Sequence, residues 1–232
     1  AVLREGFSVL ATEGNMNNEI GLPLTLLQLE PEHDVAVLEM AMRAPGEIAA
    51  LAQTARPDGG VVTNVGFAHI GLLGSQGAIA DAKAELIRAL PAHGFAVLNG
   101  DDPRVRAMEQ LAPGRSLLYG LSSDCPIRAV DVALTEYETS FAVTLDGQVA
   151  PDARFTVPVP GRHNVMNALA ALAVGWRLGI EPEAMARGLA SFRPSAMRMH
   201  FVQAPRGFTV IDDTYNANPA SVRCAIDAAL QH

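Results

Sequence analysis

Short apolar runs alternate with helical patterns through the first hundred residues of the chain. The runs are bounded by Gly, Pro, Asp and Asn, which is typical of β-strands. Between them, apolar residues recur at helical spacing. The predicted strands are residues 8–12, 34–41, 59–65 and 94–100, and the predicted helices are residues 23–29, 45–55 and 76–90.

These strands are apolar on both faces, and a predicted helix lies between each strand and the next. That alternation predicts an α/β fold with a mostly parallel sheet and helices on both of its faces. In the third helix, one face is apolar and is expected to pack on the sheet. That face carries Ile79, Ala82, Leu86 and Leu90.

The pattern changes after Gly120, where strands alternate with turn signals and predict an antiparallel patch. Helices return before residue 192, and residues 192–199 break the periodicity. A new strand and helix follow, so we predict one domain over 1–195 and the beginning of a second over 196–232. The later predicted strands are 127–136, 139–147, 153–160 and 207–214, and the later helices are 161–180, 182–192 and 219–230.

Composition narrows the class of protein. The chain has 232 residues and a formal net charge of −8, and its arginines are scattered. That distribution argues against nucleic acid as the main partner, because a phosphate-tracking surface needs a basic stripe. Cys125 and Cys224 lie far apart without metal-ligand spacing, which favours a cytoplasmic protein without a disulfide scaffold. The longest apolar run, residues 168–175, is too short to span a membrane.

Polar residues at predicted strand ends are candidates for chemistry, because ligands of open parallel sheets bind there. Taken alone, Glu39 could pair with an arginine, and His69 could be a structural histidine. Asp102 is followed by Pro103, a typical helix N-cap arrangement, which favours structural roles for Asp101 and Asp102. The candidates are Glu39, Asn64, His69, Asn99, Asp101, Asp102, Asp212, Asp213, Tyr215, Asn216 and Asn218.

Lys83 is the one lysine among 17 basic residues. A lysine amine can lose its charge on burial, whereas an arginine stays charged. A neutral amine can attack a carbonyl or take up CO2 as a carbamate, whose oxygens suit Mg²⁺. The alternative is a lysine on an exposed helix face, followed by Glu85, with no special role.

Six motifs supply context for these residues. They are GNMNNEIGLPLTLL, EMAMRAPGEIAALA, NVGFAHI, AKAEL, PGRHNVMNALAA and DDTYNANPASV, in that order. Together they resemble the Mur ligase family over essentially the whole chain. Within that family, GNMNNEIG with DDTYNANP favours the enzyme that joins D-alanyl-D-alanine to UDP-N-acetylmuramoyl-tripeptide.

The resemblance implies a three-part fold, of which this chain covers nearly all of the central ATP-binding domain and the opening of the C-terminal Rossmann-like domain. It also implies the reaction. ATP phosphorylates the terminal carboxylate of the tripeptide, the dipeptide amine attacks the acyl phosphate, and ADP and phosphate leave. The protein mainly positions the reactants and neutralises charge.

The resemblance also implies roles for individual residues. Glu39 resembles the family's magnesium-binding glutamate, His69 the histidine that helps hold a second magnesium, and Lys83 the lysine that becomes a carbamate. Three further groups are implied to bind ligands: Asn164, Asn167, Arg198 and Asp213 on ATP, Tyr215, Asn216 and Asn218 on the last substrate to bind, and Asn15, Asn17 and Asn18 on the UDP-linked substrate. The alternatives are that Asn164 is a helix N-cap and that Asn216 and Asn218 are turn residues.

The chain departs from the family pattern in three places. It has no G-x-x-x-x-G-K-[ST] phosphate loop, and AVLREGF resembles the helix that follows that loop. We therefore expect a chain that begins after the loop, exposes a sheet edge and does not turn over alone. Ala41 and Met197 stand where family members have Gly.

Two other classes of function stay open at this point. One is a sibling ligase, acting on another Mur precursor, on folate polyglutamate or on a cyanophycin-like polymer. The other is a non-catalytic nucleotide-binding scaffold that has lost its phosphate loop. For the ligase we expect ATP and Mg²⁺ as cofactors, a monomer, and a cytoplasmic location without nucleic-acid or membrane partners.

Overall fold

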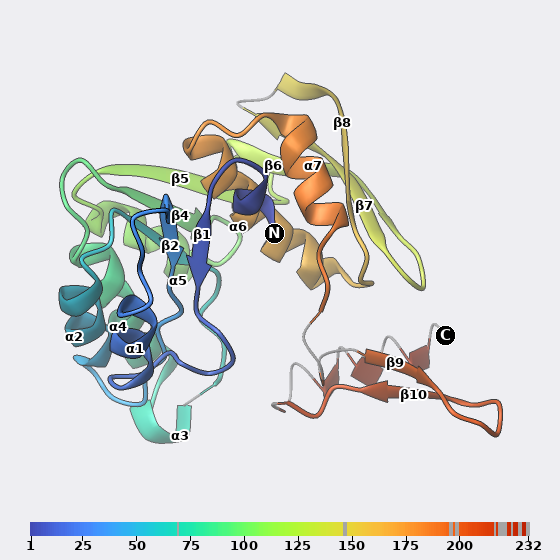
Figure 1. The fold of residues 1–232 in the computed structure, drawn as a ribbon, viewed down its shortest axis with the longest axis horizontal. Coiled ribbons are helices and arrows are strands. Elements are labelled where there is room, and N and C mark those ends of the chain that lie inside the picture. The colour runs from blue at the N-terminus through green and yellow to red at the C-terminus, as the bar shows by residue number, and fades with distance from the viewer. Residues whose placement is uncertain are drawn as a thin grey trace.

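Two short parallel strands, β1 (Val9–Ala11) and β2 (Val35–Val37), form a sheet of their own, with Val9 opposite Val35. Helix α1 (Gly21–Leu26) lies in the connection between them. Both strands coincide with predicted ones (Figure 1). The computed structural model describes residues 1–68, 70–145, 148–194, 197, 200–215, 217, 222, 223, 225, 226, 229 and 230.

The larger sheet has six strands in the order β3-β4-β5-β6-β7-β8. Its first four strands are parallel, and β6, β7 and β8 pair antiparallel. The predicted antiparallel patch is therefore an extension of the parallel sheet. The strands are β3 (Gly59–Val62), β4 (Phe95–Asn99), β5 (Arg115–Gly120), β6 (Ile127–Leu134), β7 (Thr139–Leu145) and β8 (Gln148–Val157).

Helices cover both faces of this sheet, as the sequence predicted. Strand β4 shows why, since its side chains alternate between two cores. Ala96 and Leu98 pack in one core with Ile87, and Val97 packs in the other with Leu169. The helical elements are η1 (Val2–Glu5), α2 (Glu47–Ala55), α3 (Ile70–Leu73), α4 (Gln76–Arg88), α5 (Pro103–Arg106), η2 (Ala107–Leu111), α6 (Arg162–Arg177) and α7 (Pro182–Ala190).

Strand side chains are open to solvent where β2 and β3 lie. Val37 is 45% exposed and Val61 is 39% exposed, which is unusual for apolar strand residues in an α/β fold. The described residues of β2 and β3 belong to separate sheets and make no ladder with each other. β2 and β3 each lie at an edge of their own sheet.

The last described strands, β9 (His200–Gln203) and β10 (Thr209–Asp212), form an antiparallel pair with Phe201 opposite Ile211. They lie apart from the six-stranded sheet, on the side toward which β1 points (Figure 1). β10 was predicted. β5, β9 and α3 were not.

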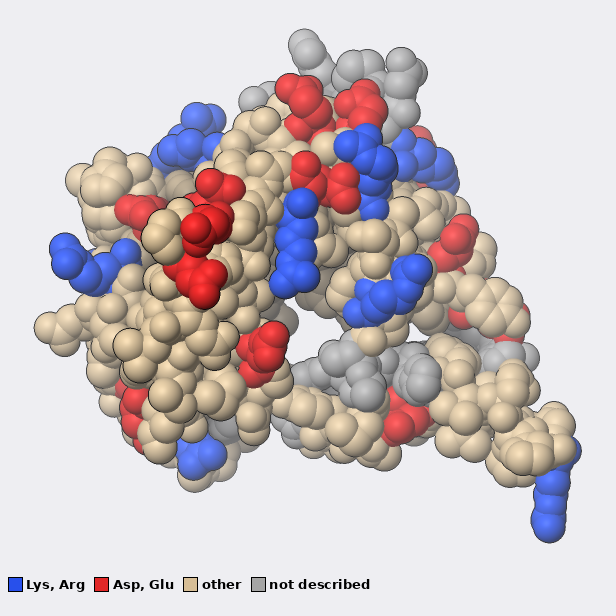
Figure 2. Space-filling view, viewed as in Figure 1, with Lys and Arg blue, Asp and Glu red and all other residues tan. Residues whose placement is uncertain are grey.

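One face of the molecule carries both basic and acidic side chains. On the face drawn in Figure 2, basic and acidic side chains are interspersed over the same elements. In the described part of the chain, no helix is long and apolar enough to cross a membrane. Cys125 is buried with a free thiol, and Cys224 lies outside the described residues.

Candidate active site

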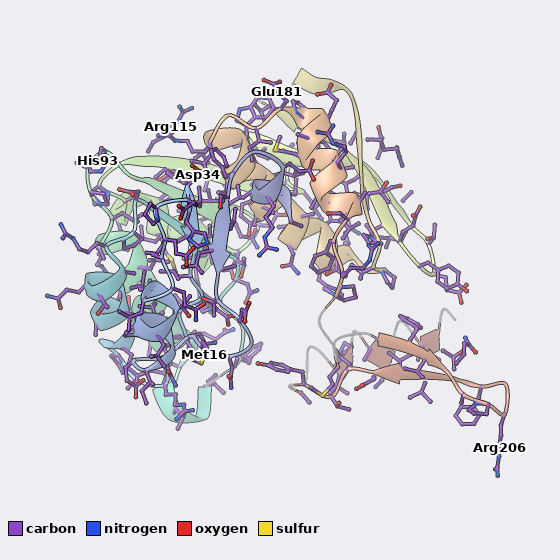
Figure 3. All side chains as sticks on the ribbon, viewed as in Figure 1. Met16, Asp34, His93, Arg115, Glu181 and Arg206 are labelled. Atoms are coloured by element: carbon purple, nitrogen blue, oxygen red, sulfur yellow. The ribbon has the colours of Figure 1, made fainter. Side chains whose placement is uncertain are left out.

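The carboxyl ends of the parallel strands define one edge of the molecule. In Figure 3, the labelled Met16, in the loop after β1, lies at the opposite end of the β1–β2 pair from Asp34, which precedes β2. Glu39, Asn64 and Asn99 all follow or end their strands at this edge. This is where ligands of open α/β sheets bind.

Lys83 points from α4 to the end of β3. Its Nζ donates a hydrogen bond to the main-chain oxygen of Asn64 at 2.6 Å. Burial lowers the pKa of the Lys83 amine, and the nearby charge of Asp102 partly opposes that shift. The alternative of a free lysine on an exposed face is therefore wrong. Glu85 lies elsewhere, where its carboxylate accepts main-chain N–H groups of α2.

The end of β3 is held by side chains from three other elements, which we call the β3-end brace. Each contact falls on the backbone of a different residue between 63 and 65. The bonds run from Asn99 Nδ2 to Thr63 O at 2.7 Å, from Lys83 Nζ to Asn64 O at 2.6 Å, and from Val65 N to Asp102 Oδ2 at 2.7 Å.

Glu39 follows β2 and is held in place by the chain around it. Its main-chain N–H donates to Thr12 Oγ1 at 2.9 Å, and its Oε1 accepts from Asn17 Nδ2 at 2.9 Å. The alternative of an arginine partner is wrong, because no basic side chain among the described residues forms an ion pair with Glu39. Its Oε2 has no hydrogen-bond partner in the described part of the chain.

The three asparagines in the loop between β1 and α1 make different contacts. Besides holding Glu39, Asn17 accepts the Ala41 N–H through its main-chain oxygen at 2.8 Å. Asn18 Oδ1 accepts the N–H groups of Ile20 and Gly21 at 3.1 and 2.8 Å, next to the start of α1. Asn15 is exposed, and its main-chain oxygen accepts the Asn17 N–H. Ala41 does not have a left-handed backbone, so it substitutes for Gly without strain there.

Glu39 and Lys83 do not touch, but the segments that carry them share a core. Met42 is buried with Val65 and Ala82, and Met40 packs against the same cluster. Among the described residues, no hydrogen bond or ion pair joins the two candidates directly. The arrangement places a carboxylate after β2 and an amine at the residues after β3, on segments that pack in one core.

Asn164 lies in the first turn of α6, whose N-cap is Gly161. The alternative that Asn164 is the N-cap is therefore wrong. Its Nδ2 donates back to Pro160 O at 2.7 Å, which fixes the amide and leaves Oδ1 available. Asn167 is exposed at the next turn of the helix.

The residues after β10 come near the start of α6. Desolvation lowers the pKa of His163, and the charge of Asp213 opposes that shift, so Asp213 lies within electrostatic range of α6. Tyr215 is 45% exposed, and its N–H donates to Met197 O. His69, Arg198, Asn216 and Asn218 lie outside the described residues.

Asp101 makes a second cluster that sequence reasoning did not find. Its carboxylate accepts the N–H groups of Leu121 and Ser122 at 2.6 and 3.1 Å. Burial raises the pKa of Asp101, but these hydrogen bonds outweigh it and hold the pKa below its usual value. Arg106 Nη2 lies 3.5 Å from the buried Cys125 thiol. The two adjacent aspartates at a strand end were the signal in the sequence. That signal does not indicate which loop each aspartate binds.

The described donors are compatible with Mg²⁺ but do not form a complete protein cage. No cluster of three or more His, Cys, Asp or Glu residues occurs in the part of the chain that the structure describes. Mg²⁺ commonly takes one or two protein carboxylates and obtains its other ligands from phosphates and water. The free Oε2 of Glu39 fits that pattern.

The fold and the strand-end residues define a class of protein. The Mur ligase middle domain model matches residues 1–175, and the chain belongs to that family.

Three individual proteins are similar to this chain over nearly its whole length. The chain is 39% identical over 226 residues to the UDP-N-acetylmuramoyl-tripeptide--D-alanyl-D-alanine ligase of Bacillus subtilis, covering 97% of this chain and 48% of that protein. It superposes on MurF from Acinetobacter baumannii with a TM-score of 0.92 and 31% identity, covering 100% of this chain and 50% of that one. It also superposes on MurF ligase from Thermotoga maritima, in complex with ADP, with a TM-score of 0.84 and 32% identity. That match covers 99% of this chain and 52% of the Thermotoga chain. The chain therefore spans about half the length of the relatives it matches.

Proposed function

We propose that this chain is the central part of an ATP-dependent ligase that adds D-alanyl-D-alanine to UDP-N-acetylmuramoyl-tripeptide in peptidoglycan precursor synthesis. The observation that carries the proposal is the position of Lys83, whose amine donates to the backbone just after β3, while Glu39 follows β2 on a segment that packs in the same core. The names of the Bacillus and Acinetobacter relatives supply the substrate pair.

The reaction needs charge neutralisation where phosphate is transferred. ATP gives its γ-phosphoryl group to the tripeptide carboxylate, and the dipeptide amine then displaces phosphate to form the amide. Glu39 would bind Mg²⁺ through Oε2, and the metal would neutralise phosphate charge. His69 is assigned to a second Mg²⁺.

Lys83 is proposed to act as a carbamate. Its neutral amine adds to CO2 and releases one proton, which leaves an anionic oxygen donor on the side chain. Burial favours the neutral amine that this step requires, since it lowers the Lys83 pKa. Arginine could not take this role because it keeps its charge.

The nucleotide and the remaining substrates are assigned to the other candidates. ADP in the Thermotoga relative supports ATP use. We assign ATP to Asn164, Asn167, Arg198 and Asp213, and the amide Oδ1 of Asn164 is free to accept from a base. We assign the UDP-linked substrate to Asn15, Asn17 and Asn18, and the dipeptide to Tyr215, Asn216 and Asn218.

We propose that residues 1–195 are a central ATP-binding domain and that residues 196–232 begin a second domain. Pairing of β9 with β10 supports this division. β2 and β3 each lie at the edge of a sheet, which supports a further parallel strand that pairs between them and carries a phosphate loop. We expect a cytoplasmic monomer.

The test is a substrate-dependent phosphate assay on the intact gene product. We expect phosphate release that requires ATP, D-alanyl-D-alanine and the UDP-linked tripeptide together. Release with another Mur precursor, with folate or with a polymer substrate would instead assign a sibling ligase. Nucleotide binding without release on any of these substrates would favour a scaffold and contradict the proposal.

A further inference from the structure

The β3-end brace contains one peptide group that is held at both of its ends. The oxygen of Asn64 and the nitrogen of Val65 belong to the same peptide bond. Lys83 Nζ donates to that oxygen at 2.6 Å, and Asp102 Oδ2 accepts from that nitrogen at 2.7 Å. Since a peptide group is planar, fixing its N–H direction also fixes the direction of its C=O. The acceptor that Lys83 uses is therefore oriented by Asp102.

Asp102 is itself anchored. Its other oxygen, Oδ1, accepts the N–H groups of Arg104 and Val105 at 2.9 and 3.3 Å and caps α5. Each carboxylate oxygen thus has a separate task, one on a helix start and one on a strand end. Charge-assisted hydrogen bonds of this kind are stronger than neutral ones. The carboxylate ties the end of β3 to the end of β4, after which α5 begins.

We propose that Asp102 is a positioning residue for Lys83, which it acts on through the peptide group between residues 64 and 65. Asp102 touches no substrate in this account. The catalytic part of the proposal rests on the ligase function proposed above. Its structural part, that Asp102 sets the orientation of one peptide group, stands independently of that function.

The test compares two adjacent aspartates in the intact gene product. Asp102→Asn keeps a cap oxygen for α5 but loses the carboxylate that accepts from Val65. Asp102→Ser is a second variant, because Ser also caps helices and is too short to reach β3. Asp101→Asn is the matched control, since Asp101 also accepts two main-chain N–H groups, but from the loop after β5.

We expect both Asp102 variants to lower kcat by about 10- to 100-fold, the range caused by a misplacement of about 1 Å, with KM for ATP changed less than about threefold. Asp101→Asn should change kcat less than about twofold. In a Lys83→Ala background, Asp102→Asn should have no further effect on residual turnover, because residues that act as a unit are not additive. Equal losses of kcat in both backgrounds, or for both aspartates, would overturn the proposal.

A second readout separates this proposal from the ligase function. Hydrogen exchange at the Val65 amide should be at least about tenfold faster in Asp102→Asn than in wild type and unchanged in Asp101→Asn. If wild type releases no phosphate but this pattern is observed, the ligase function fails and the positioning role on the peptide group stands. If Val65 exchanges at the wild-type rate in Asp102→Asn, the positioning role is wrong whatever the activity.

Discussion

The two halves of the six-stranded sheet use their residues differently. In the parallel half, polar side chains at the end of β4 and just after it hold the backbone that follows β3, as Asn99 holds Thr63 O. In the antiparallel half, β6, β7 and β8 bury Phe141 and Phe155, whose rings stack with centroids 6.0 Å apart, and carry none of the candidate site residues. The parallel half therefore carries candidate residues, whereas the antiparallel half supplies a large part of the core on which α6 and α7 pack.

The largest expected effect is in the antiparallel half. Phe141 is fully buried, so Phe141→Ala should lower the free energy of unfolding by about 3–5 kcal/mol through lost burial and a residual cavity. Urea denaturation of the chain measures this. Leu134→Ala, at an exposed site on β6, is the control and should cost far less. Equal losses at both positions would mean that this half is not a packed core.

Glu39→Gln tests the parallel half. It should leave the free energy of unfolding within about 0.5 kcal/mol, because Glu39 is exposed. In the intact protein it should lower kcat about 100-fold, equivalent to roughly 2.7 kcal/mol, and weaken Mn²⁺ binding measured by electron paramagnetic resonance. Glu47→Gln is the control, since the Glu47 carboxylate accepts the main-chain N–H groups of Arg43 and Ala44. A stable, fully active Glu39→Gln enzyme would contradict the metal assignment.

Glu85 tests whether the parallel half also depends on its side chains for stability. Its two oxygens accept the N–H groups of Gly46 and Ala49 at 2.7 and 2.9 Å, which places a negative charge at the start of α2. Glu85→Ala should cost about 1–2 kcal/mol through loss of a cap and of a favourable charge at the helix N-terminus. Thermal unfolding at low and high salt measures the loss of the cap and the loss of the favourable charge separately, because salt screens only the charge. No change in either condition would rule out this contact as a source of stability.

The smallest expected effect lies outside both halves, at Met197. This residue has φ 61°, in the left-handed region that disfavours side chains. Met197→Gly should therefore stabilise the chain by about 1 kcal/mol or leave it unchanged, depending on the entropy that Gly adds to the unfolded state. Met197→Ala keeps the strain and is the control. A clear destabilisation by Gly, but not by Ala, would show that the backbone there is not strained.

Hydrophobic patterning predicted the α/β class, both strands of the small sheet and the antiparallel patch, because burial imposes a periodicity that a sequence records. It missed β5, where RSLLYG mixes polar and apolar residues, and β9, which lies next to the break around Pro194. Strand-end reasoning located Glu39 and Asn64. It could not predict that Asn17 would hold Glu39, since that contact joins loops 22 residues apart and depends on how each loop folds.

The aspartate pair shows the same limit. The sequence DDP predicted the helix cap at Asp102, which is confirmed, because capping is local. The same carboxylate also accepts the Val65 N–H. That hydrogen bond joins residues 37 positions apart in the sequence and depends on how β3 and β4 pair. Long-range contacts of this kind are set by tertiary structure and leave no local pattern.

The role of Lys83 is tested most directly by the activity of Lys83→Ala in the intact protein, with and without added acetate or bicarbonate. We predict an active wild type and a variant with almost no phosphate release, restored in part when a small carboxylate occupies the place of the carbamate. A variant that matches wild type would contradict the account, because the one lysine of the chain would then have no part in the reaction.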